Sequence, residues 1–80
     1  MNWIPIKINS KKIEMIRDML WFTQEEIADE IWLKHRAYAY NLEKWTMKPE
    51  RIKLLVKVLN IRTEKLIRLF KEIKEEDIII

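Results

Sequence analysis

The 80-residue sequence predicts a single all-α domain of five helices, with short extended segments at its two ends. Apolar residues recur at spacings of three and four in five stretches, which is the pattern of helices with one buried face. Side chains suited to helix ends flank several of these stretches. The chain is 49% hydrophobic and 36% charged, a balance typical of folded globular proteins. We expect one domain over residues 1–80, with a core at about 11–70 and terminal segments at 1–10 and 76–80.

The first ten residues indicate an extended segment followed by a helix start. Isoleucines alternate with other residues over 3–8, and Pro5 restricts such a strand to the edge of a sheet. Asn9 and Ser10 offer side-chain oxygens that can cap a helix. We therefore expect a first helix over about 11–20.

The second helix has the clearest start signal in the sequence. Thr23 and Glu26 form a T-x-x-E capping box, in which each side chain accepts a hydrogen bond from the backbone of the other residue. Phe22 and Ile27 are spaced as a hydrophobic staple across this start. A helix is therefore expected to begin just after Thr23 and to end before a short turn at 32–34.

The third helix is expected over residues 35–44. Its inner face should comprise Tyr38, Ala39, Leu42 and the following Trp45. The four tryptophans of the chain add large apolar area to a small domain, so we expect them in the core, although Trp3 also suits a dimer contact.

Two further helices are expected in the remaining chain. Pro49 suits the first turn of a fourth helix, and Asn60 should end it because asparagine tolerates the left-handed conformation. A fifth helix is expected over about 63–75. The isoleucines at 78–80 are β-prone, and they could pair with residues 3–8 within one chain, exchange with them across a dimer, or fray.

Charge is segregated along the chain, whose formal net charge is +3. Residues 34–53 hold six cations and two anions, whereas residues 24–31 hold four anions and no cation. Such segregation is expected if one surface meets an anionic partner and another does not.

Several residue types are missing, and their absence excludes function classes. Without glycine there is no glycine-rich phosphate loop, and without cysteine there is no disulfide or thiolate metal site. A single histidine, His35, makes a histidine metal cluster impossible, and we expect no catalytic residues, no cofactor and no enzyme activity. The start lacks the features of a secretory signal and no run of apolar residues is long enough for a membrane span, so an intracellular (cytoplasmic) protein is expected.

Three motifs in order resemble one family. Residues 23–31 read TQEEIADEI; Glu43, Trp45 and Pro49 fit the spacing E-x-G-x-x-x-P; and residues 59–66 read LNIRTEKL. Together they span about residues 11–70 and resemble the phage-repressor-like (Cro-like, XRE-like, lambda-repressor-like) helix-turn-helix family. The resemblance implies a five-helix DNA-binding domain that acts as a sequence-specific transcriptional regulator, in the first place a repressor.

The chain departs from the family pattern at its glycines. That pattern has glycine in the turn between the second and third helices, after the third helix, and at the last joint. Trp32, Trp45 and Asn60 stand at or near these places, and the stretch from Ala28 to Glu43 is one residue longer than the usual pattern. Counting back from Glu43 nevertheless gives a register for the third helix.

In this register Ala39 and Leu42 form the buried pair, and the helix 35–44 presents its opposite face to the major groove. The base-contacting residues are expected to be Arg36, Ala37, Tyr40 and Asn41. Arginine can fork onto guanine, asparagine can pair with adenine, and alanine can touch a thymine methyl group. Tyr40 also places its hydroxyl within reach of a phosphate or a sugar.

Phosphate contacts are expected at the edges of this surface. The resemblance implies that Gln24, at the start of the second helix, binds a phosphate with help from the helix dipole. The full expected phosphate set is Gln24, His35, Lys44, Lys48 and Arg51.

Such domains usually bind double-stranded DNA as two-fold dimers, so a homodimer is expected, with the terminal segments as its contacts and the fifth helix as a second candidate contact. Two alternatives remain open. One is an antitoxin-like DNA-binding protein that also binds a toxin partner. The other is a protein-interaction module, such as a viral inhibitor of a host protein, which keeps the fold without binding DNA.

Overall fold

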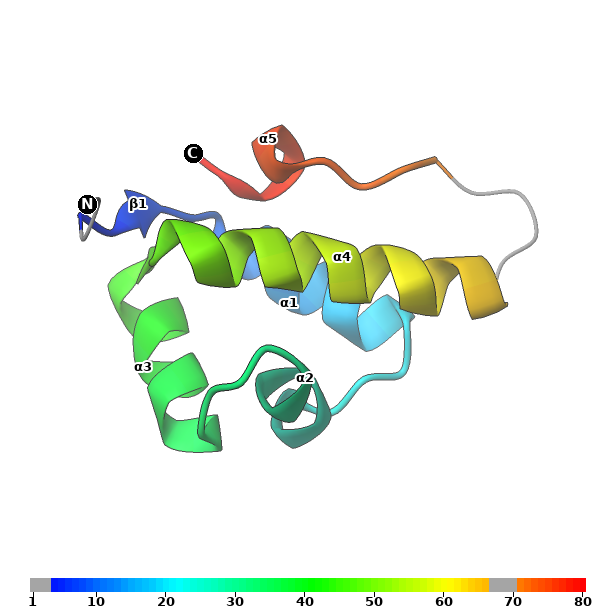
Figure 1. Ribbon diagram of the computed structural model, residues 1–80, viewed down its shortest axis with the longest axis horizontal. Helices are drawn as coiled ribbons and strands as arrows, with labels where there is room; N and C mark the ends of the chain where they lie inside the picture. Colours follow the sequence, from blue (N-terminus) through cyan, green and yellow to red (C-terminus); the bar gives the residue numbers. More distant parts are fainter. Residues whose placement is uncertain (1–3, 67–70) are drawn as a thin grey trace.

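The computed structural model describes residues 4–66 and 71–80. Along this part of the chain the elements are β1 (Ile6–Lys7), α1 (Ser10–Met19), α2 (Gln24–Glu30), α3 (His35–Lys44), β2 (Thr46–Met47), α4 (Pro49–Leu66) and α5 (Glu75–Ile78). The long helix α4 runs through the middle, with α2 and α3 on one side and residues 71–80 on the other (Figure 1). The described chain is therefore mostly helical, as predicted, and adds a short two-stranded sheet.

The caps expected at the first two helices are confirmed. The Asn9 side chain caps α1 by accepting from the Lys12 N–H at 3.0 Å. At α2 the Thr23 hydroxyl accepts from the Glu26 N–H at 3.1 Å, and Glu26 Oε1 accepts from the Thr23 N–H at 2.9 Å. The hydrogen bond from the Thr23 backbone lowers the pKa of Glu26, because it favours the charged carboxylate.

Three tryptophans hold the left-handed conformation in which glycine is the usual residue. The φ angles are 60° at Trp21, 63° at Trp32 and 58° at Trp45, and each residue directly follows or closes a helix end. The expectation of a core position is wrong for all three, since they are 83%, 79% and 42% exposed. A left-handed residue that ends a helix lies in a turn at the surface, and its side chain points away from the core. Trp3 lies outside the described residues.

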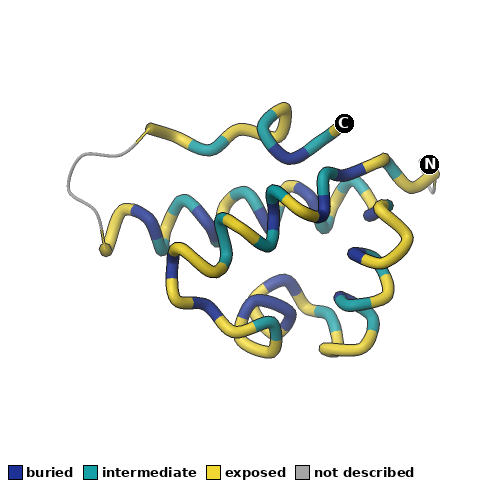
Figure 2. The backbone as a smooth tube through the Cα atoms, turned by 180° about the vertical axis from the view of Figure 1, so that it is seen from behind, coloured by how far each residue is buried: buried dark blue, intermediate teal, exposed yellow. Residues whose placement is uncertain are grey.

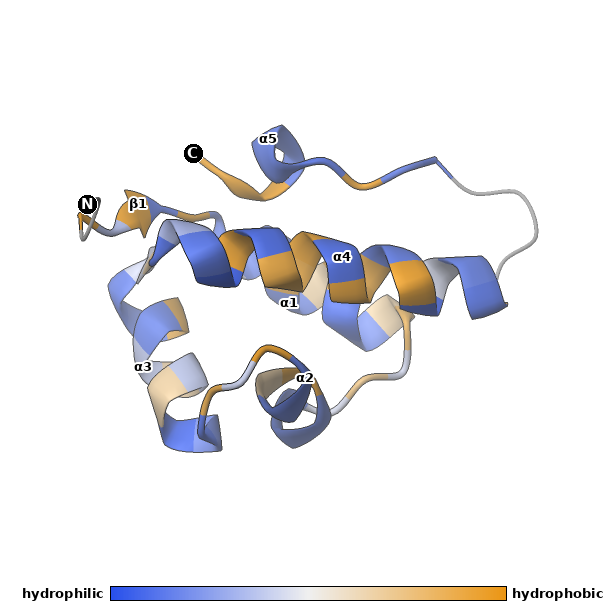
Figure 3. Cartoon of the chain, in the orientation of Figure 1, coloured by the Kyte–Doolittle hydropathy of each residue, from blue (hydrophilic) through white to orange (hydrophobic). Residues whose placement is uncertain are grey.

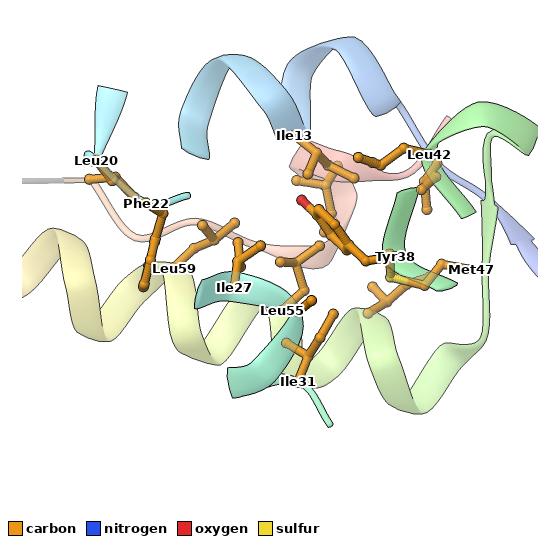
Figure 4. Packing of buried hydrophobic residues seen from close by; sticks show 14 residues of the cluster. Ile13, Leu20, Phe22, Ile27, Ile31, Tyr38, Leu42, Met47, Leu55 and Leu59 are labelled. Atoms are coloured by element: carbon orange, nitrogen blue, oxygen red, sulfur yellow. The ribbon is translucent and has the colours of Figure 1, made fainter. Parts of the chain in front are cut away.

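The core forms where α1, α2, α3 and α4 converge. Phe22, Ile27, Tyr38, Leu55 and Leu59 are among its members, and Figure 4 shows the Tyr38 ring in the middle of the group. Buried and exposed residues alternate along α4, which carries bands of hydrophobic residues between charged ones (Figures 2 and 3). Within the described ranges, no helix has the length and apolar character to cross a membrane.

The two ends of the described chain pair with each other inside one protomer. β1 pairs antiparallel with β2, with Ile6 opposite Met47. On its other side Ile8 bridges Ile79, the Asn9 N–H donates to the Ile78 carbonyl at 2.8 Å, and the Ile80 N–H donates to Lys7 at 3.1 Å. Of the three alternatives for residues 78–80, pairing within one chain is the arrangement found. The strand β2 itself was not expected.

The fourth helix starts at Pro49 as expected, but its expected end and the bounds of the expected fifth helix are wrong. Asn60 does not end a helix, because α4 continues through it to Leu66. The Asn60 side chain instead donates to the Ile73 carbonyl and accepts from the Ile73 N–H, both at 2.8 Å. Of the helix expected over 63–75, residues 63–66 belong to α4, 67–70 lie outside the described residues, and 71–74 are not helical. Asn60 thus fastens the segment that holds Ile73, which we call the returning chain, to α4.

Candidate nucleic-acid interface

Helix α3 has the predicted bounds and turns one ridge of side chains away from the core. Tyr38 and Leu42 point inward, and Tyr38 is fully buried. At about 100° per residue, the ridge formed by Arg36, Tyr40 and Lys44 lies on the opposite side of the helix. All three side chains are exposed. Three of the residues expected on the outer face are therefore aligned along it.

The predicted buried pair of α3 needs a correction. Ala39 was expected to accompany Leu42 in the core, but Tyr38 takes that place and Ala39 is only half-buried. A tyrosine ring buries far more apolar area than a methyl group, so packing favours the register that buries Tyr38.

The two flanks of the ridge differ in composition. Ala37 and Asn41 lie together on one flank and are half-buried. Among the described residues, the Asn41 side chain has no hydrogen-bond partner. His35, Ala39 and Glu43 follow the other flank, which faces α2. Asn41 and His35 therefore lie on opposite sides of the ridge.

Tyr40 and Lys44 contact each other on the ridge. The Lys44 ammonium lies 5.5 Å from the centre of the Tyr40 ring, one helical turn away. A cation over an aromatic face is attracted by the ring quadrupole. This contact restricts both exposed side chains before any ligand arrives.

The start of α3 is tied to the start of α2 through Gln24. His35 Nε2 lies 3.0 Å from Gln24 Oε1, an acceptor, so this ring nitrogen carries the proton. The Gln24 amide nitrogen donates in turn to Glu14 on α1. Gln24 was expected to contact a phosphate, yet its oxygen and one amide hydrogen are already engaged, which leaves the second amide hydrogen for a ligand.

Glu14 is a residue that sequence reasoning missed. Its carboxylate accepts from Arg17 Nε at 2.9 Å, from the Tyr38 hydroxyl at 3.2 Å and from Gln24. It therefore joins α1 to both helices of the candidate interface. Glu14 belongs to no local motif, and only the folded chain brings its three partners together.

The cations expected to bind phosphate lie at the C-terminal end of α3. Lys44 closes that helix, Lys48 precedes α4, and Arg51 lies in the first turn of α4. Lys44 and Lys48 are exposed and Arg51 is half-buried. The expected phosphate set thus divides into one group at each end of α3, with Gln24 and His35 at the other end.

Two acidic side chains also border this surface. Glu25 is exposed, and its carboxylate lies 3.9 Å from His35 Nδ1. Glu43 is exposed on the flank of α3. A nearby carboxylate opposes a phosphate but can accept from the amino group of cytosine. The surface is therefore mixed in charge rather than uniformly basic.

Trp32 is a further exposed residue beside this surface. It lies in the turn between α2 and α3, three positions before His35. The signal that could have identified it is a tryptophan at a position where the helix-turn-helix pattern has glycine.

No three His, Asp or Glu side chains gather as a metal site in the described ranges. No protein-family model, curated protein or solved structure matches the chain.

Proposed function

We propose that the chain is a sequence-specific double-stranded DNA-binding regulator of the lambda-repressor-like helix-turn-helix type, acting as a repressor. In this proposal α3 enters the major groove and α2 lies across its entrance. One observation carries the proposal: the outward ridge of Arg36, Tyr40 and Lys44 is flanked at both helix ends by groups suited to phosphate. The major groove exposes base edges at its floor and has a phosphate backbone along each side. Side chains that read bases in the middle of α3, with phosphate-binding groups at both ends, fit this arrangement.

The base-reading roles follow from the side chains along the ridge and its Asn41 flank. Arg36 is near the start of α3 and forks onto guanine O6 and N7. Asn41, which has no partner among the described residues, pairs with adenine N6 and N7. Ala37 contacts a thymine methyl group, and the Tyr40 hydroxyl reaches a base edge or the sugar–phosphate backbone.

The phosphate roles are divided between the two ends of α3. Gln24 uses its free amide hydrogen, and its side-chain oxygen holds the His35 ring beside the same phosphate. Lys44, Lys48 and Arg51 hold the backbone on the opposite side. Each phosphate neutralised by a cation should contribute about 0.9 to the slope of log K against log salt.

Fluorescence anisotropy with labelled duplex DNA in a salt series tests this proposal. The DNA is the region upstream of the protein's own gene, with random duplex as the competitor. We expect tight binding that weakens steeply with salt, and loss of the preference for the specific duplex in Arg36→Ala/Asn41→Ala. Lys71→Ala is the control, because residues 71–74 lie on the other side of α4 from α3 (Figure 1). Absence of binding at low salt contradicts the proposal.

A protein-interaction module is the second candidate, and exposed apolar side chains favour it. Trp21 and Met19 are 83% and 67% exposed at the end of α1. Such exposure is typical of surfaces that bind proteins. This candidate predicts little salt-dependent DNA binding and no effect of Arg36→Ala/Asn41→Ala on its interactions. An antitoxin-like protein combines both properties and predicts DNA binding together with a tight protein partner.

The terminal segments expected at the homodimer contact are already paired within the single chain. Residues 6–9 and 78–80 already pair within the protomer, and Ile8 and Ile78 are fully buried there. An exchanged sheet would form these same hydrogen bonds between two copies, so it would add no contact that the single chain lacks. A dimer of this fold is better served by apolar surface that the protomer leaves uncovered.

A further inference from the structure

Trp21 is an exposed tryptophan in a conformation that disfavours it. It follows α1 with φ of 60°, and its N–H donates to the Asp18 carbonyl at 3.1 Å. Glycine would hold this left-handed turn at a lower conformational cost. The indole is 83% exposed, so packing within the protomer offsets little of that cost. A contact outside the protomer would explain the residue.

Trp21 stands beside two adjoining hollows between the α1–α2 turn and the C-terminal half of α4. One is lined by Met19, Trp21, Arg62 and Leu66. The other is lined by Phe22, Glu30, Val58, Ile61, Arg62 and Lys65. Arg62 lines both hollows, and we name the two together the α1–α4 groove.

The groove is held in shape by Arg62. Its Nε donates to the Leu20 carbonyl at 3.0 Å and its Nη2 to the Trp21 carbonyl at 3.1 Å. Its guanidinium also lies 4.5 Å from the centre of the Phe22 ring. These contacts fix the turn that presents Trp21, so a binding partner finds the surface already formed.

Opposite charges line the same hollow. Glu30 comes from the end of α2 and Lys65 from the last turn of α4. Neither side chain forms an ion pair with another described residue. A two-fold axis through the apolar centre would bring Glu30 of one copy to Lys65 of the other, and the reverse. Such pairing of a patch with itself is the requirement for a symmetric dimer.

We propose that the α1–α4 groove is a homodimer interface, in which each copy packs Trp21 against the hollow of the other and pairs its Glu30 with Lys65 of the second copy. A second copy fits better than an unrelated protein because one face carries a projecting side chain, a hollow and both charges. The C-terminal ends of α1 and α4 lie away from α3, so this dimer leaves α3 uncovered (Figure 1). The inference does not depend on DNA binding.

Sedimentation of the full chain over a concentration series, without DNA, tests the interface. We expect a dimer for the unsubstituted protein and at least about tenfold weaker association for Trp21→Asn. Trp32→Asn is the matched control, since Trp32 is also left-handed and exposed but lies outside the groove. Asparagine tolerates the left-handed turn, and circular dichroism checks that both variants fold.

Charge reversal supplies a second, independent arm. Glu30→Lys and Lys65→Glu should each weaken the dimer, and the double variant should restore it because the charges again oppose each other. A monomer at all concentrations, equal effects of Trp21→Asn and Trp32→Asn, or no restoration in the double variant overturns the proposal. DNA binding is measured in a separate experiment, so failure of the dimer interface and failure of DNA binding can be told apart.

Discussion

The hydroxyl group of Tyr38, on α3, donates a 3.2 Å hydrogen bond to Oε2 of Glu14, on α1. The Tyr38 ring is fully buried, and the same carboxylate accepts from Arg17 and from Gln24. One acidic side chain therefore links α1 to the inward face of α3 and to the first residue of α2. Contacts made by buried and partly buried residues therefore help to hold the proposed recognition helix in its orientation.

Tyr38→Phe should lower the free energy of unfolding by about 1.5–3 kcal/mol, the usual contribution of a hydrogen bond to a charged group. The ring stays in place, so the loss isolates the hydroxyl. Urea unfolding followed by circular dichroism measures it. Tyr40→Phe is the control, because that exposed ring should change stability by less than about 0.5 kcal/mol. Equal effects of the two substitutions would contradict the role of the buried hydroxyl.

The stability of the protein should fall in alkaline solution because of Tyr38. Burial raises the pKa of Tyr38 above the ordinary value, and Glu14 raises it further. The unfolded chain then loses this proton at a lower pH than the folded one. The stabilisation is complete below pH of about 10 and declines above it, by at most about 1.4 kcal/mol per pH unit. Unfolding measured between pH 9 and 11 in Tyr38→Phe should show a shallower decline, and an unchanged slope would contradict this assignment.

Asn60→Ala should release the returning chain from α4. It removes both hydrogen bonds to Ile73, and we expect a loss of about 1–2 kcal/mol together with faster amide exchange at Ile73. Hydrogen exchange and trypsin cleavage after Lys71 and Lys74 report the release directly. Asn41→Ala is the matched control, since alanine favours an α-helix and Asn41 has no partner in the described chain. Unchanged exchange at Ile73 would contradict the fastening role.

Trp32→Gly should leave the protein as stable as before or more stable by up to about 1 kcal/mol, because glycine removes the left-handed strain. Trp32→Val should destabilise it, since a β-branched side chain fits this conformation worst. Thermal unfolding of the two variants gives the comparison. The opposite order would mean that the Trp32 side chain stabilises the protomer by packing.

The sequence was informative where local interactions decide the structure. The Thr23 and Glu26 capping box lies within four residues, and α2 starts where it predicts. The bounds of α3 were also correct, because a short turn precedes it and Trp45 ends it in the left-handed conformation. Trp32 and Trp45, which are left-handed, stand at or near two places where the helix-turn-helix pattern that the sequence resembles has glycine, whereas the left-handed Trp21 was not anticipated.

Distant contacts decided the features that sequence reasoning missed. Asparagine is a residue type that suits a helix end, but Asn60 lies inside α4, where its side-chain amide bonds the backbone of Ile73. The rotation of α3 depends on Tyr38 reaching Glu14, which lies 24 positions earlier in the chain. The composition of the candidate site was predictable to the extent that Arg36, Tyr40 and Lys44 align on one ridge. Glu14 was not predictable, because two of its partners, Gln24 and Tyr38, lie 10 and 24 positions away in the sequence.

Selection of binding sites from a random duplex library tests the central claim most directly. The account predicts that the unsubstituted protein enriches one preferred sequence containing guanine and adenine positions. Arg36→Ala should lose the preference at the guanine, Asn41→Ala at the adenine, and Lys71→Ala at neither. If no sequence is enriched above random duplex, or if Arg36→Ala and Asn41→Ala enrich the same site as the unsubstituted protein, α3 is not a sequence-reading helix.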